Sequence, residues 1–365
     1  MNPFHRRWLT TTLILSLMFG VPPGVNACTG IRVTAKDGSV IRARTMEFGL
    51  DLESEVLVVP RGFDRTGTTP RGADGMRWKS KYASVGANGV GLPYVFDGLN
   101  EKGLALGLFY FPTTAQYQAF DPSKASQTLA PWELGSWILE NFASVSEVRQ
   151  SISNVVTAEV VFPSWGFVPP AHYVVYDASG QSIVIEYVGG RLQVHDNPLG
   201  VMSNSPAFDW HMTNLRNYVN LSVNSHPPVQ VGSVTLAPFG QGSGMLGIPG
   251  DFTPPSRFVR AVAYSTSLLP PATGADAVLE AFHILNNFDI PKGAARDGSH
   301  DAKGNITVDY TLWTSVCDLR TRQFFFRTYE NSQLRSVDLM KMPLDGAAIV
   351  HLPMKGNEVI RSLVP

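Results

Sequence analysis

The chain has 365 residues, of which 44% are hydrophobic and 16% charged, and its formal net charge is −1. This composition is typical of a folded globular protein and excludes a disordered chain. Because the charge is nearly balanced, there is no basic field, and we expect neither nucleic acid nor an anionic membrane surface as a partner.

The first 27 residues have the pattern of an export signal. Residues 5–7 are basic, residues 9–20 are apolar, and residues 25–27 supply the small side chains that precede a cleavage site. The apolar run is shorter than the roughly 20 residues that span a bilayer, and no later segment is long and apolar enough to do so. We therefore expect residues 1–27 to be removed, leaving a periplasmic or secreted protein without a membrane span that begins at Cys28.

A cysteine at a free N-terminus carries a nucleophile and a base on one residue. An α-amine has a pKa of about 7.7–8.0 and a thiol one of about 8.5. The amine of Cys28 can thus accept the thiol proton and return it to a leaving nitrogen. The junction also permits another interpretation, a bacterial lipoprotein signal, although Asn26 stands where that signal has a small residue. Lipidation would cap both groups, and the chain would then be a lipid-anchored binding protein without catalysis.

After Cys28 the sequence indicates strands and helices in an irregular order. A hairpin is predicted from residues 29–34 and 39–48, because Lys36-Asp37-Gly38 between them is typical of a tight turn. The further expected elements are a strand at 55–60, an exposed loop at 61–80, strands within 94–111 turning at 97–103, a helix from about 131, a hairpin at 172–195 turning at 177–180, a helix at 207–222, a Gly/Pro-rich loop at 231–256, helices at about 256–268 and 274–287, and strands around 307–318 and 321–330. This order predicts an α+β protein with helices covering sheets, in one domain over residues 28–365.

The chain has two cysteines, Cys28 and Cys317. Export would permit a disulfide, but Cys317 lies in an apolar strand pattern over 310–319, so we expect a buried structural thiol. The sequence has no HExxH or CxxC motif, and we expect no metal site. Residues 242–247 match GxGxxG in letters only, because Pro249 follows where a dinucleotide site needs a helix.

Seven short strings then stand out along the chain. They are Cys28-Thr-Gly, Arg42-Ala-Arg-Thr-Met-Glu-Phe48, Asp97-Gly-Leu-Asn-Glu-Lys-Gly-Leu104, Gly200-Val-Met-Ser-Asn-Ser-Pro206, Asp209-Trp-His-Met-Thr-Asn-Leu-Arg216, Pro238-Phe-Gly-Gln-Gly242 and Gly250-Asp-Phe-Thr-Pro-Pro-Ser-Arg257. In this order the set resembles the choloylglycine hydrolase family, the N-terminal-nucleophile amidases that include penicillin V acylases and conjugated bile salt hydrolases. The resemblance implies a four-layer αββα sandwich of two antiparallel sheets, a small-molecule N-acyl amide as substrate, no cofactor, and a homotetramer.

The resemblance also assigns roles to the charged residues. It makes Cys28 the nucleophile and, through its amine, the base. Arg44 would lie beside the thiol and favour its ionised form. Glu47 stands where the family usually has an aspartate that holds the α-amine, and it is one methylene longer. Arg257 would complete the charged shell around the cysteine.

Two further residues bear on the transition state and the substrate. The resemblance implies that the side-chain amide of Asn204 and the backbone N–H of Tyr110 donate to the oxyanion. Bile salt hydrolases of the family usually have asparagine at the position of Tyr110, whereas penicillin V acylases resemble this sequence there. An aromatic ring suits a flat phenoxyacetyl group. We therefore expect a penicillin V acylase-like enzyme that could also cleave N-acyl homoserine lactones, with conjugated bile salt hydrolysis as the alternative.

Overall fold

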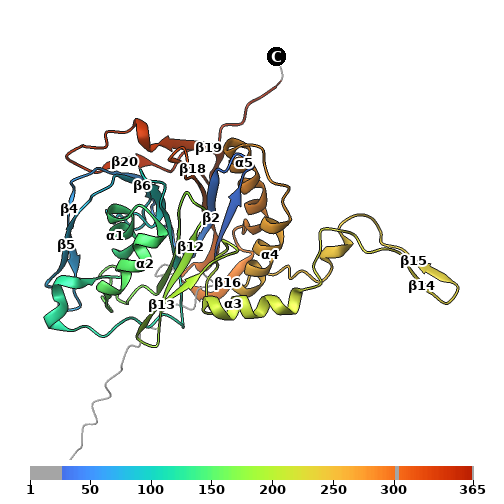
Figure 1. The fold of residues 1–365 in the computed structure, drawn as a ribbon, viewed down its shortest axis with the longest axis horizontal. Helices are drawn as coiled ribbons and strands as arrows, with labels where there is room; N and C mark the ends of the chain where they lie inside the picture. Colours follow the sequence, from blue (N-terminus) through green and yellow to red (C-terminus); the bar gives the residue numbers. More distant parts are fainter. Residues whose placement is uncertain (1–26, 301–303, 364–365) are drawn as a thin grey trace, which may run out of the picture.

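The computed structural model describes residues 27–300 and 304–363. The predicted export signal, apart from Ala27, lies outside these residues. Figure 1 shows a body of layered sheets and helices and one segment, residues 219–249, that extends away from it and is called the arm below. Within the described ranges, no helix is both long and apolar enough to cross a membrane.

The first sheet contains Cys28. Its strand order is β1-β2-β17-β18-β19, and β16 pairs with β17. The strands are Cys28–Thr34 (β1), Val40–Phe48 (β2), Ala295–His300 (β16), Ile306–Asp318 (β17), Gln323–Thr328 (β18) and Asn331–Asp338 (β19). The β1–β2 pair confirms the hairpin predicted around Lys36-Asp37-Gly38, and its register sets Cys28 opposite Met46.

The second sheet has eight strands in the order β13-β12-β11-β8-β7-β6-β3-β20. They are Glu55–Val59 (β3), Ser84–Ala87 (β6), Asp97–Asn100 (β7), Ala105–Tyr110 (β8), Ala171–Tyr176 (β11), Ser182–Val188 (β12), Arg191–Asp196 (β13) and Val350–Pro353 (β20). Side chains alternate between its faces, as strand geometry requires. In β3, Val56 and Val58 belong to the core shared with the first sheet, whereas Leu57 and Val59 belong to the core on the other face.

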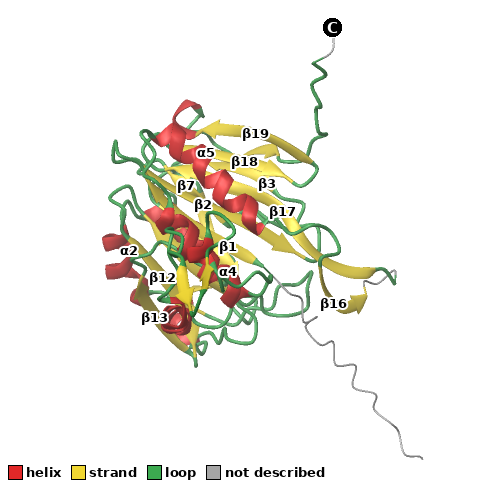
Figure 2. Cartoon of the chain, turned by 90° about the vertical axis from the view of Figure 1, so that its right-hand side faces the viewer, coloured by secondary structure: helices red, strands yellow, loops and turns green. Residues whose placement is uncertain are grey.

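Helices cover the outer face of each sheet. On the first sheet, α4 (Pro254–Ser267) contacts β1, and α5 (Gly274–Leu285) contacts β1, β2 and β17; Figure 2 shows α5 lying across these strands. On the second sheet, α1 (Leu134–Asn141) contacts β7 and β8, and α2 (Val145–Ser151) packs in the same core. The four layers confirm the predicted α+β class and the αββα sandwich.

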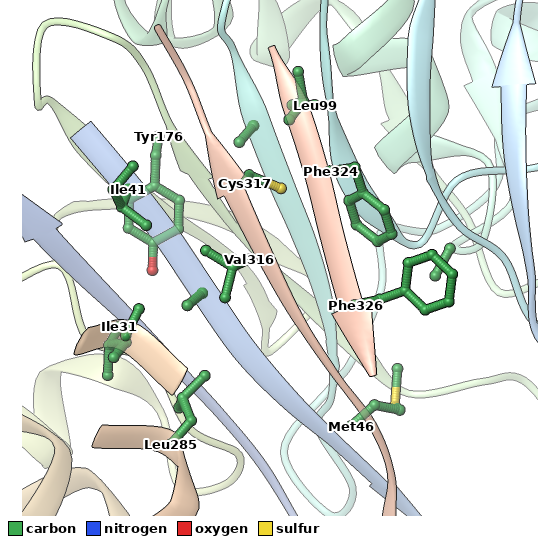
Figure 3. Packing of buried hydrophobic residues seen from close by; sticks show 14 of the residues in the cluster. Ile31, Ile41, Met46, Leu99, Tyr176, Leu285, Val316, Cys317, Phe324 and Phe326 are labelled. Atoms are coloured by element: carbon green, nitrogen blue, oxygen red, sulfur yellow. The ribbon is translucent and has the colours of Figure 1, made fainter. Parts of the chain in front are cut away.

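The largest core includes side chains from both sheets. Figure 3 shows Cys317 of β17 among them, together with Leu99 and Tyr176 of the second sheet and Phe324 of β18. Both cysteines are free and buried, which confirms the interpretation of Cys317 as a buried thiol outside any disulfide. Burial raises the pKa of Cys317 to about 12.

The exposed loop predicted over residues 61–80 is wrong. Asp64–Thr68 (β4) and Asp74–Lys79 (β5) form an antiparallel hairpin there. Arg65 of β4 is buried, and its Nη2 lies 2.7 Å from Oε1 of the buried Glu140. The inward position of this strand is thus held by an arginine whose charge is compensated, not by an apolar residue. Because the inward position has an arginine, the strand lacks the alternating apolar pattern by which a strand is recognised in a sequence.

The turn predicted over residues 97–103 is wrong in its first half. Residues 97–100 form β7, and the chain reverses only after them. Asp97 is fully buried, where it forms an ion pair with Arg42 and accepts a hydrogen bond from Ser315. An aspartate followed by glycine is typical of a turn, but here the aspartate neutralises an arginine between the sheets.

The helix predicted over residues 207–222 ends early. Phe208–Asn214 forms α3, a short 3-10 helix follows, and the chain then enters the arm. The loop predicted over residues 231–256 contains the second strand of a small hairpin, Val229–Val231 (β14) paired with Val234–Leu236 (β15). The sequence analysis also did not predict α2, the parallel pair of β9 (Thr128–Leu129) and β10 (Val156–Thr157), or strands β6, β16, β19 and β20. The second strand of the hairpin predicted over 172–195 is in fact two strands, β12 and β13.

Candidate active site

The backbone of Cys28 is held by a ring of hydrogen bonds. Its N–H donates to Asn204 Oδ1 at 2.6 Å, and its carbonyl oxygen accepts from Arg257 Nη1 at 2.6 Å. Arg257 Nη2 closes the ring by donating to Asn204 Oδ1 at 2.8 Å. All three residues are buried. The first residue of β1, the loop after β13 and helix α4, which are far apart in sequence, therefore meet at the predicted nucleophile.

Tyr110 joins this ring through its main chain. Asn204 Nδ2 donates to the Tyr110 carbonyl oxygen at 2.7 Å. A side-chain amide nitrogen carries two hydrogens, so one of them remains for a substrate oxygen. Burial raises the pKa of Tyr110 to about 12, with the charge of Asp309 adding to the shift, and the phenol is therefore neutral at physiological pH. Its ring meets that of Phe48 edge to face at a centroid distance of 5.7 Å.

The sulfur atom of Met46 contacts both Arg44 and the thiol of Cys28. Arg44 Nη2 donates to Met46 Sδ at 3.6 Å, and Cys28 Sγ donates to the same sulfur at 3.8 Å. The guanidinium also donates to the Leu108 carbonyl oxygen at 2.6 Å and lies 4.2 Å from the centroid of the Phe109 ring. Sequence analysis expected Arg44 beside the thiol and did not identify Met46, which the structure places in contact with both.

Glu47 is buried beside the charged groups of the ring. Its Oε1 accepts from Thr311 Oγ1 at 2.9 Å, whereas its buried Oε2 has no hydrogen-bond partner among the described residues. Burial raises the pKa of Glu47 to about 8, and the Arg257 guanidinium opposes this rise. Burial likewise lowers the pKa of Arg257 to about 10. The residue expected to hold the α-amine thus has one oxygen free, while the Cys28 nitrogen is bonded to Asn204.

The peptide bond that precedes Cys28 is buried as well. Ala27 has no exposed surface, and its side chain packs in a small cluster with Ile290 and Ala295.

An apolar pocket adjoins the thiol. Cys28, Met46 and Tyr110 contribute to its lining, and Phe48 and Trp165 stack on each other in its wall at 5.6 Å. The other lining residues are Leu52, Val90, Leu92, Phe96, Leu108, Pro131, Trp132, Phe162, Pro169, Pro170 and Ala171. The hollow encloses about 620 Å³ of space that no atom fills, including its open mouth. Its lining can hold an apolar acyl group next to the nucleophile.

The described side chains do not meet the requirements of a metal site. In the part of the chain that the structure describes, no three His, Cys, Asp or Glu side chains gather closely enough to hold a metal ion.

The comparisons with known proteins agree with this geometry. Residues 28–352 match the family model described as linear amide C–N hydrolases, choloylglycine hydrolase family. The chain is 33% identical over 326 residues to a bile salt hydrolase/transferase of Clostridium perfringens, covering 88% of this chain and 95% of that protein. It is 28% identical over 334 residues to a penicillin V acylase of Pectobacterium atrosepticum, covering 84% and 80%.

Solved structures give the same picture. A variant of conjugated bile acid hydrolase from Clostridium perfringens superposes with a TM-score of 0.81 at 30% identity, covering 92% of this chain and 100% of that one. Penicillin V acylase from Agrobacterium tumefaciens superposes with a TM-score of 0.71 at 25% identity, covering 89% and 91%.

Proposed function

Because this chain belongs to the choloylglycine hydrolase family of linear amide C–N hydrolases, we propose that it transfers the acyl group of an N-acyl amide to Cys28, with phenoxyacetyl amides such as penicillin V as preferred substrates. One observation carries the choice of substrate: six of the sixteen residues that line the pocket beside the thiol are aromatic, and one of them is Tyr110. By the family resemblance, bile salt hydrolases usually have asparagine at the position of Tyr110. Stacked and edge-to-face rings favour a flat aromatic acyl group.

The reaction begins once cleavage frees the amine of Cys28. The amine accepts the thiol proton, and the thiolate attacks the amide carbonyl carbon. The second hydrogen of Asn204 Nδ2 and the backbone N–H of Tyr110 donate to the resulting oxyanion. The ammonium returns the proton to the leaving nitrogen as the C–N bond breaks, and water then hydrolyses the thioester and regenerates the thiol.

The charged residues hold this arrangement. Arg257 fixes the Cys28 carbonyl and the Asn204 side chain together. After cleavage, the new ammonium group of Cys28 donates a hydrogen bond to Oε2 of Glu47, which has no other partner among the described residues. The positive ammonium and the negative carboxylate then compensate each other's buried charge. Arg44 acts on the thiolate through the polarisable sulfur of Met46, which touches both groups.

The test is the ratio of kcat/KM values for purified mature protein. We expect penicillin V to be cleaved at least about tenfold better than glycocholate or taurocholate, a difference of roughly 1.4 kcal/mol in transition-state binding. Conjugated bile salts are the second candidate, favoured by the 33% identity and the TM-score of 0.81 to bile salt-cleaving relatives. Preference for a conjugated bile salt would replace the first assignment by the second.

N-acyl homoserine lactones are candidate natural substrates. They offer the same amide next to an apolar acyl chain, and an exported enzyme would meet them outside the cytoplasm. Release of homoserine lactone from a series of acyl lengths, followed by mass spectrometry, tests this extension. An enzyme that cleaves penicillin V but leaves every member of the series intact would contradict it.

We also propose that residues 1–27 are removed on export and that the mature enzyme is periplasmic or secreted. The intact mass of protein recovered from exporting cells tests this. An unmodified chain starting at Cys28 leaves thiol and amine free and supports the mechanism. A mass raised by diacylglyceryl and acyl groups would cap both and would contradict it.

The arm supports assembly into the proposed homotetramer. The strands of its hairpin and the residues just after them expose more than half of the surface of each of five apolar side chains, Val229, Val231, Val234, Leu236 and Phe239. Such an exposed group on a projecting segment is typical of an interface between copies. Sedimentation at micromolar concentration should give four chains per particle, and a variant with residues 223–247 replaced by a short Gly-Ser link should sediment as a smaller species. Monomeric wild-type protein would contradict the proposal.

A further inference from the structure

Asn204 makes the central contacts of the site from a segment without regular secondary structure. It lies between β13 and α3, and its side chain bonds Cys28, Arg257 and Tyr110. Misplacement of a catalytic group by about 1 Å can cost on the order of 10²-fold in rate. The segment therefore needs fixed points, and its hydrogen bonds show where they are.

Two buried histidines donate to two successive peptide carbonyls of this segment. His172 Nε2 lies 3.0 Å from the carbonyl oxygen of Ser203, and His211 Nε2 lies 2.8 Å from that of Asn204. Both rings are almost fully buried. One histidine comes from β11 in the second sheet and the other from α3, so the segment is held from two sides.

Both ring nitrogens of His172 have hydrogen-bond partners. Its Nδ1 lies 2.9 Å from Oε1 of the buried Glu186, so each nitrogen faces an acceptor. Glu186 also accepts the N–H of Phe208 at 3.1 Å with both oxygens. The Phe111 ring stacks on the imidazole with centroids 4.0 Å apart. The ring of His172 is thus fixed in position and in plane.

His211 works as a neutral donor. Burial lowers its pKa to about 4, so it carries one ring hydrogen at physiological pH. The carbonyl of Asn204 accepts that hydrogen from Nε2, and the buried Nδ1 has no partner among the described residues. The ring stacks on Phe258 with centroids 4.7 Å apart. Phe258 follows Arg257 in α4, so His211 packs against the helix whose arginine donates a hydrogen bond to the Cys28 carbonyl.

We propose that His172, held by Glu186, and His211 are positioning residues that set the side chain of Asn204 for oxyanion stabilisation. Neither histidine lines the pocket, and both would act on Asn204 through the two carbonyls. This inference rests on the proposed acyl-transfer function, in which Asn204 is a catalytic residue. Histidines that only filled the core would stabilise the fold without a specific link to Asn204.

The test is a double-mutant cycle with the complete mature enzyme, residues 28–365, and penicillin V as substrate. His211→Phe keeps the ring stack and removes the hydrogen bond, and we expect kcat to fall about tenfold with little change in KM. In an Asn204→Ala background, the same change should lower kcat less than about twofold, because a residue that acts through Asn204 has nothing left to position. His211→Gln, which retains an N–H, should recover part of the loss.

Additional variants make the cycle decisive. His172→Phe should show the same dependence on Asn204, and melting temperatures identify any variant that fails to fold. His351→Phe is the matched control, since His351 also bonds a glutamate, Glu55, at 2.8 Å, but on the exposed edge strand β20. Equal losses from His211→Phe in both backgrounds would overturn the inference alone. A wild-type enzyme that cleaves no amide would overturn the proposed function and the inference with it.

Discussion

The two cysteines of this protein belong to the same sheet and are both buried and free, yet their surroundings differ. Cys28 adjoins the apolar pocket, and Asn204 and Arg257 bond its backbone. Cys317 faces the core, where burial raises its pKa to about 12. Burial alone keeps a thiol protonated and inert. The proposed reactivity of Cys28 would depend on a freed amine, its polar neighbours and access through the pocket.

Replacing each cysteine by alanine gives the largest contrast. Cys28→Ala should lower turnover by more than about 10⁴-fold, because it removes the atom that forms the acyl-enzyme, and the melting temperature should stay close to that of the wild type. Cys317→Ala is the matched control and should retain wild-type kcat while losing about 1 kcal/mol of stability from the small cavity. Turnover that survives in Cys28→Ala would remove the basis of the comparison.

Asn204→Ala tests the polar neighbours of Cys28. We expect kcat to fall by about 10²–10³-fold, since one oxyanion donor and the acceptor of the Cys28 nitrogen are lost together. The control is Asn331→Ala, because Asn331 is also buried and donates to a main-chain carbonyl, that of Asn357, far from the pocket. A loss of the same size in both variants would mean that the effect is one of folding.

Alkylation compares the two thiols directly. Iodoacetamide at pH 8 should label Cys28 in the folded mature protein and leave Cys317 unlabelled, and unfolding in urea should expose both. Peptide mass spectrometry assigns the sites. Labelling of Cys317 at a similar rate in the native protein would show that its raised pKa and burial do not protect it.

The buried Glu47 should have a smaller effect, on how the free energy of unfolding depends on pH. In the folded chain before cleavage, burial raises the pKa of Glu47 to about 8, above its usual value of 4.5, so the folded chain holds a proton that the unfolded chain releases. The free energy of unfolding therefore falls as pH rises between these values, by at most about 1.4 kcal/mol per pH unit. Glu47→Gln should abolish this part of the slope in urea titrations at pH 5, 6.5 and 8, whereas the exposed Glu53→Gln should not. Parallel curves for wild type and Glu47→Gln would contradict the buried carboxyl.

Local patterns predicted those parts of the fold that are local. The turn around Asp37 predicted the β1–β2 hairpin, and a hairpin centred there sets residue 28 against residue 46. The spacing alone therefore predicts the contact between Cys28 and Met46, which the sequence analysis did not identify. The hairpin at residues 64–79 was missed because a buried arginine interrupts the apolar alternation.

The rest of the site has no local signal. Asn204 lies 176 positions from Cys28, and only the family resemblance brought the two together before the structure did. His172 lies in none of the strings that carry the resemblance, and His211 lies in the string 209–216 without a role assigned to it. Their partners are main-chain carbonyls, which any residue would supply. Contacts of this kind follow from how the layers stack, and no sequence pattern records them.

If residues 1–27 are removed as proposed, the burial of Ala27 limits when the bond before Cys28 can be cut. A peptidase must take an extended stretch of chain on both sides of the bond that it cuts, but here the residues on both sides are inside the folded body. An external enzyme can therefore reach the bond only while the chain is still unfolded. If folding comes first, the nitrogen of Cys28 remains an amide and the molecule is inactive unless the thiol cuts the bond itself. The order of cutting and folding thus decides how many active molecules each round of synthesis yields.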